Sequence, residues 1–172
     1  MPTTAVESTL DVALWFLDRA RLEDNYLQAQ KLQRLLYLAQ GYYAAKYYGR
    51  KLMPATFVAH EMGPMEPNVY RLFEIGRPQI PSVGTPPEVE DFLQLMWRQF
   101  GQFSTERLGD LVRKHDVYIA AMQAGKGEEI GFETISEFFG RKEKPAEKIR
   151  TADGRTVTKW VPTKRADSRF AR

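Results

Sequence analysis

The chain offers few side chains that could perform acid–base, nucleophilic or metal chemistry. Its two histidines, His60 and His115, lie 55 residues apart, and neither has a His or carboxylate three or four positions away on one helical face. Cysteine is absent, which excludes disulfides, thiolate nucleophiles and zinc–thiolate sites. The sequence contains neither a Gly-rich nucleotide motif nor a Gly-x-Ser-x-Gly elbow. We therefore predict no catalytic residue, no metal site, no cofactor and no enzymatic activity.

Tyrosines are the more informative side chains, because five of them fall within or just after one predicted helix of about six turns: Tyr37, Tyr42, Tyr43, Tyr47 and Tyr48. Tyrosine is enriched at binding hot spots, yet the same spacing also suits a buried face, so a core role and a partner-binding role both stay open. Downstream, Gly63 and Pro64 indicate a turn, and His60 beside Glu61 suits a structural or surface residue better than a catalytic base. The predicted partner-binding residues are Tyr42, Tyr43, Tyr47, Tyr48, His60, Gly63, Pro64 and Tyr70.

Helical periodicity and capping residues predict the elements that carry these side chains. A first helix is expected near 8–22, after a Ser8 and Asp11 capping box, and a second near 28–48. A short strand near 56–60 follows, then a turn at 62–64 and a helix that starts at Pro67. Thr85, Pro86 and Glu88 predict the N-cap, first proline and capping acid of a further helix. Further helices are expected from Ser104, across 117–122 and from Thr134.

These elements predict a mainly α fold, a compact helical domain with a small β element and a basic C-terminal hairpin or tail. A length of 172 residues suits one well-buried domain. We expect that domain over 1–140, followed by a basic extension over 141–172. Asp153-Gly154 between two β-prone runs predicts a hairpin near 148–161.

The chain resembles the Panacea family of antitoxins, which includes the SocA-like protease adaptors. The resemblance is carried by KLQRLLYLAQGYY from Lys31, by GPMEPNVYRLF from Gly63, and more weakly by FSTERLGDLVRKHDVYIAAMQAG and GFETISEFF. It covers about residues 8–140. It implies an antitoxin that binds and neutralises a cognate protein toxin, and a SocA-like member would also deliver that toxin to the ClpXP protease.

Charge is distributed unevenly along the chain. Residues 1–140 carry 14 Lys and Arg against 18 Asp and Glu, a net charge of −4, whereas residues 141–172 carry 11 against 4, a net charge of +7. Such a basic arm suits an acidic partner, or is a solubilising terminus. The predicted second interaction surface consists of Arg150, Arg155, Lys159, Trp160, Lys164 and Arg165.

A nucleic-acid-binding regulator is the alternative function. Helices near 104–139 followed by a basic hairpin would imitate a winged helix, but the seven acids between Glu106 and Glu137 would repel phosphates and disfavour nucleic acid. The N-terminal 24 residues indicate a helix rather than a targeting segment, and no apolar run approaches the ~20 residues that span a bilayer. We therefore expect a cytoplasmic location and no membrane partner.

Overall fold

The computed structural model describes residues 3–81, 83–142, 148–150 and 156–158. The helices of this part are α1 (Thr9–Leu22), α2 (Ala29–Lys46), α3 (Pro67–Phe73), α4 (Pro87–Phe100), α5 (Thr105–Arg113), α6 (Asp116–Ala124) and α7 (Phe132–Lys142). Its strands are β1 (Phe57–His60), β2 (Gly63–Met65), β3 (Glu129–Ile130), β4 (Lys148–Arg150) and β5 (Thr156–Thr158). The prediction of a mainly α fold with a small β element is confirmed.

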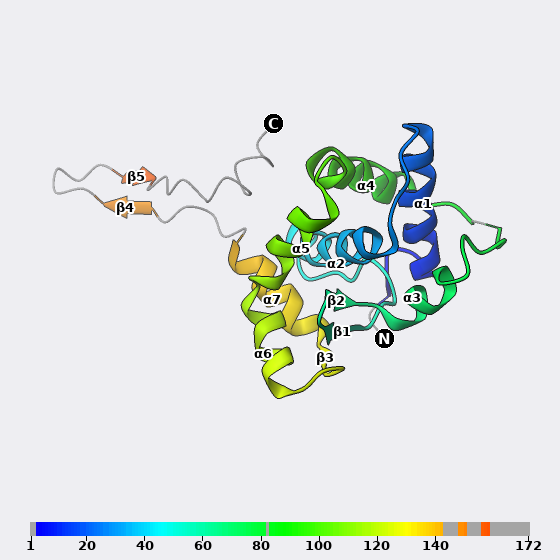
Figure 1. Ribbon diagram of the computed structural model, residues 1–172. Helices are drawn as coiled ribbons and strands as arrows, with labels where there is room; N and C mark the ends of the chain where they lie inside the picture. Colours follow the sequence, from blue (N-terminus) through cyan, green and yellow to red (C-terminus); the bar gives the residue numbers. More distant parts are fainter. Residues whose placement is uncertain (1–2, 82, 143–147, 151–155, 159–172) are drawn as a thin grey trace.

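Helix α2 forms the centre of the helical body, and Figure 1 shows the other helices arranged around it. It contacts α1, α3, α4, α5, α7 and β2. A helix that is enclosed on all sides must be apolar around most of its circumference, and five consecutive residues, 35–39, are fully buried. Gly41 lets α7 approach, since a Cβ at this position would lie 2.2 Å from Cδ2 of Phe139.

Polar side chains start several helices where the sequence predicts them. The Ser8 hydroxyl accepts a hydrogen bond from the N–H of Leu10 at 3.1 Å, and Ser104 accepts one from the N–H of Arg107 at 3.1 Å. In α3 the Glu66 carboxylate accepts from the N–H of Val69 at 2.7 Å, directly before Pro67. These three start sites are confirmed.

Two predicted helix starts are wrong by one or two residues. The N-cap of α4 is Pro86 rather than Thr85, whose hydroxyl instead donates to the Glu90 carboxylate at 2.9 Å. Tandem prolines explain the shift, because either proline suits a first helical position. Helix α7 begins at Phe132 rather than Thr134.

Strands β2, β1 and β3 form one antiparallel sheet in that order. His60 pairs with Gly63, so the turn is Glu61 and Met62, and Gly63 and Pro64 lie in β2. The predicted turn at 62–64 is therefore displaced towards its N-terminal side. Gly63 has φ of 115°, a backbone conformation that suits glycine, so this glycine is required at the start of β2 rather than in the turn. Strand β3 is not anticipated by the sequence, because it has only two residues.

Strands β4 and β5 pair antiparallel, with Ile149 opposite Val157, which confirms the two arms of the predicted hairpin. Its expected turn at Asp153-Gly154 lies outside the described residues. The division of the chain near residue 140 stays a prediction, and α7 continues past it to Lys142. In the described part of the chain, no helix is long and apolar enough to cross a bilayer.

Candidate partner-binding site

Arg34 on α2 joins the β1–β2 hairpin to α5. Its guanidinium donates to the carbonyl of Met62 at 2.8 Å and to that of Thr105 at 2.5 Å, while the residue is only 4% exposed. Burial, followed by the nearby charge of Arg113, lowers the pKa of Arg34. Gly109 leaves room for this side chain, because a Cβ there would lie 2.9 Å from Cζ of Arg34. Arg34 therefore fixes the position of the hairpin against the helices.

Two buried glutamines on α2 satisfy main-chain groups of neighbouring segments. Gln33 accepts from the N–H of Glu66 at 2.7 Å and donates to the carbonyl of the same residue at 3.3 Å. Gln40 accepts from the N–H groups of Leu52 and Met53 and donates to the Met53 carbonyl at 3.0 Å. Buried main-chain groups need such partners, so the two amides hold irregular chain against the central helix.

Tyr37 and His115 form a buried polar contact between α2 and the start of α6. The Tyr37 hydroxyl lies 2.9 Å from Nδ1 of His115. Phe57 and Phe139 pack edge-on against the Tyr37 ring, and burial raises the pKa of Tyr37. Nearby, the hydroxyl of Tyr118 donates to the carbonyl of His60. These aromatic hydroxyls position backbone and side chains within the fold.

The tyrosines near the C-terminal end of α2 divide into buried and exposed members. Tyr42 stacks on Phe100, and Tyr43, which is fully buried, donates to the Glu88 carboxylate at 3.0 Å. Tyr47 is half-buried against Tyr43. Tyr48 is fully exposed and has φ of 53°, a left-handed conformation uncommon for a large side chain. Of these rings, Tyr48 is the one that is fully exposed.

The segment that contains Arg34, the two glutamines and the Tyr37–His115 pair matches a known protein family. Residues 32–117, half of the chain, match the family described as antitoxin SocA-like, Panacea domain. The chain belongs to this family. No curated protein and no solved structure matches the chain. The match confirms the resemblance over its central part, from the second residue of the KLQRLLY motif to the start of α6.

The Panacea match and the predicted site residues overlap in sequence, but the structure does not gather those residues into one surface. Tyr42, Tyr43, Gly63 and Pro64 are buried, whereas His60 and Tyr70 are half-buried on β1 and α3. Among the described residues, no hydrogen bond or ring contact joins Tyr48 to His60 or Tyr70. A direct role in partner binding stays a prediction for all eight positions, with Tyr48 the most accessible.

The predicted second surface falls mostly outside the described residues. Arg150 lies in β4, opposite Thr156, and the structure does not describe its side chain. The other members, Arg155, Lys159, Trp160, Lys164 and Arg165, lie beyond the residues that can be described. The role of these cations stays a prediction.

The residues that organise the Panacea region were missed as candidates by sequence reasoning. Arg34, Gln33, Gln40 and His115 are polar yet at most 5% exposed. The sequence did contain a signal for them. Gln33, Arg34 and Gln40 are polar residues within a long, mainly apolar helix that is buried over residues 32–44, and such residues need hydrogen-bond partners inside the fold. In the described part of the chain, no group of three His, Asp or Glu residues is placed to hold a metal ion.

Proposed function

We propose that this chain is an antitoxin that binds and neutralises a cognate protein toxin. The observation that carries the proposal is the Panacea match over residues 32–117. Arg34, Gln33 and Gln40 are engaged with main chain inside the fold, so they support the structure of that region and leave its surface to meet a partner. The toxin is expected to be a small protein encoded beside this chain.

Co-expression tests the proposal. The neighbouring gene product should arrest growth alone, lose its toxicity when this chain is present, and co-purify with it. A variant that unfolds the core, Phe139→Asp, serves as the control for nonspecific rescue, since Phe139 is fully buried. Rescue by the unfolded control, or the absence of a complex with the wild-type chain, would exclude neutralisation by binding.

The finer proposal is that the antitoxin delivers its toxin to the ClpXP protease. The SocA-like description of the family supports it, and so does the need for a second surface, which the basic residues 141–172 would supply. A tethered arm raises the effective concentration of a partner at little structural cost. Changing Arg150, Arg155, Lys159, Lys164 and Arg165 to Gln in the full chain should leave toxin binding intact and slow toxin degradation in a purified system. Degradation at the full rate would remove the arm from the mechanism.

The nucleic-acid alternative is disfavoured by the surface of the helices it would use. The acids of the α5–α7 region are all exposed: Glu106, Asp110, Asp116, Glu128, Glu129, Glu133 and Glu137. A DNA backbone would meet this negative face beside the hairpin. A titration with duplex DNA should show no tight, strongly salt-dependent binding, and such binding would revive the alternative.

A further inference from the structure

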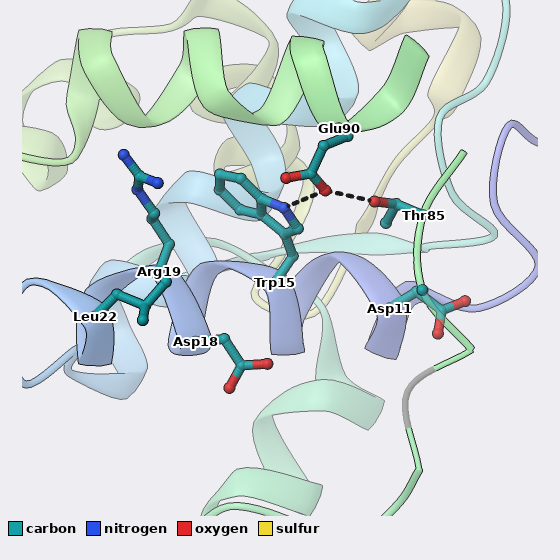
Figure 2. A pocket seen from close by; sticks show the side chains of 8 residues that line it. Asp11, Trp15, Asp18, Arg19, Leu22, Thr85 and Glu90 are labelled. Carbon is teal, nitrogen blue, oxygen red and sulfur yellow. Dashed lines mark hydrogen bonds between the residues drawn. The ribbon is translucent and has the colours of Figure 1, made fainter. Parts of the chain in front are cut away.

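Helix α1 borders three hollows that share some of their lining residues. The first, with a volume of about 180 Å³, is shown in Figure 2 between α1, the start of α4 and residues 84–85. The second, of about 380 Å³, shares Asp11, Gly84 and Thr85 with the first, and the third, of about 240 Å³, shares Glu7 with the second. We call this surface the α1 groove, and its key residues are Glu7, Asp11, Trp15, Asp18, Val83 and Glu90.

Asp11 is the member of the α1 groove that is not explained by the fold. It is 7% exposed and lines both of the first two hollows. Its carboxylate has no hydrogen-bond or ion-pair partner in the described part of the chain, although Asp18 pairs with Arg77 and Glu90 accepts from Trp15 and Thr85. The expected return bond of a capping box to the Ser8 N–H is not formed either. In the described part of the chain the buried side-chain atom without a partner is Nε of Arg19, so the Asp11 oxygens open onto the hollows, where a cation can reach them.

The rest of the lining combines negative charge with apolar surface. Glu7, Asp18 and Glu90 add carboxylates, while the only cation that lines any of the three hollows is Arg19, at the far end from Asp11 in Figure 2 and 3.5 Å from Glu23. Trp15 is half-buried and lines the first hollow together with the exposed Leu22, and the exposed Val83 lines the second hollow. Lysine and arginine stems pack on such apolar surface while their charged ends reach a carboxylate.

We propose that the α1 groove binds a basic segment of the cognate toxin, with a Lys or Arg paired to Asp11 and apolar neighbours against Trp15 and Val83. This inference rests on the proposed antitoxin function and adds the site and the chemistry of the partner. Charge complementarity selects the occupant, because an acidic or purely apolar segment would leave Asp11 unpaired. The α1 residues of the groove lie outside the residues that match the family, whereas Val83 and Glu90 lie within them.

Asp11→Asn tests the carboxylate with little change in shape. We expect toxin affinity to fall by about 10-fold or more, because charge-assisted hydrogen bonds are roughly twice as strong as neutral ones. The wild-type affinity should also weaken between ionic strengths of about 0.1 M and about 1 M, and the variant should lose much of that dependence. Glu133→Gln is the matched control, since Glu133 is an exposed acid in the first turn of α7 and has no ion pair in the described structure.

A second pair of variants avoids any cost in folding. Val83 is 86% exposed, so Val83→Lys adds a cation to the groove without disturbing the core and should weaken toxin binding. Ile119→Lys on α6, at a residue that is 42% exposed, is its control and should bind as the wild type does. Normal toxin affinity in both Asp11→Asn and Val83→Lys would overturn the groove proposal and leave the antitoxin function standing.

A probe that does not depend on the toxin separates the two proposals. The wild-type chain should bind a labelled amphipathic Leu-Lys peptide and ignore its Leu-Glu counterpart, and Asp11→Asn should lose this preference. Equal binding of both peptides would overturn the groove proposal even if the toxin is neutralised. If Asp11→Asn instead binds toxin more tightly, the occupant is the basic extension of the chain itself, and the toxin assignment of the groove is wrong.

Discussion

Helices α1 and α2 contact each other, yet their buried polar side chains differ in whether they have hydrogen-bond partners. In α2, Gln33, Arg34 and Gln40 are buried and make hydrogen bonds to the main chain of other segments. In α1, Asp11 is almost as deeply buried but has no partner among the described residues, and it faces hollows instead of chain. A buried polar group that bonds to neighbouring main chain stabilises its own fold, whereas a carboxylate that opens onto a hollow remains accessible to another molecule.

This contrast separates the scaffold from the recognition surface. The central helix and its polar contacts lie within residues 32–117, which match the Panacea family. The groove residues of α1 precede the matched residues, whereas Val83 lies within them but is 86% exposed, so it can be changed without disturbing the core. We therefore expect mutations in α2 to act on stability and mutations along α1 to act on binding.

The largest expected effect comes from removing a buried ring of α2. Tyr43→Ala should lower the free energy of unfolding by about 3–5 kcal/mol, as other large aromatic truncations in cores do. Tyr48→Ala on the same helix end should stay within about 0.5 kcal/mol of the wild type, because Tyr48 is exposed. Chemical denaturation of both variants measures the difference, and equal effects would mean that the division into buried and exposed tyrosines is wrong.

A smaller loss of stability is expected when the buried amide of Gln40 on α2 is replaced by an apolar side chain. Gln40→Leu leaves the N–H groups of Leu52 and Met53 without partners, while the Met53 carbonyl keeps the N–H of Ala55, so the expected cost is about 1–3 kcal/mol. Gln123→Leu, at an exposed position of α6, is the control and should change stability little. If Gln40→Leu left the free energy of unfolding unchanged, water would have to satisfy those main-chain groups. The stabilising role assigned to Gln40 would then be wrong.

Alkaline pH should weaken the fold through Tyr43. Burial, and then the hydrogen bond to Glu88 and its charge, raise the pKa of Tyr43 to about 12, against about 10 for tyrosine in an unfolded chain. The folded state favours the protonated phenol. The stabilisation that the protonated Tyr43 gives to the fold is therefore complete below a pH of about 10 and is lost as pH rises towards about 12. Tyr43→Phe removes this ionisation. The stability of the wild type minus that of Tyr43→Phe should fall across this window in denaturation at several pH values, and a constant difference would contradict the raised pKa.

Local signals in the sequence were sufficient to predict most elements, but long-range contacts determined the burial of their side chains. Ser8, Pro67 and Ser104 mark helix starts because capping involves residues within one turn. The spacing of the tyrosines near the end of α2 does not show which of them are buried. Phe92 packs against Tyr43 and buries it, whereas Tyr48 is exposed. Asp11 was recognised as a capping acid and not as a groove residue, because the loop that completes the groove is distant in sequence.

The smallest expected change in stability is a gain, and it tests whether Tyr48 is kept for binding. Tyr48 follows the C-cap Tyr47 with φ of 53°, and the N–H of Gly49 donates to the Ala44 carbonyl at 2.7 Å, so Tyr48 occupies the left-handed position where glycine is preferred. A non-glycine residue in this conformation costs roughly 1 kcal/mol, and a fully exposed ring offers little in return within the monomer. Tyr48→Gly should therefore raise the free energy of unfolding by up to about 1 kcal/mol while it weakens toxin binding by about 1–2 kcal/mol. Tyr26→Gly, at another exposed tyrosine outside the helices, controls for the loss of exposed aromatic surface. Opposite signs for stability and affinity in Tyr48→Gly would mark an interface residue, whereas a stabilised variant with full affinity would exclude Tyr48 from the interface.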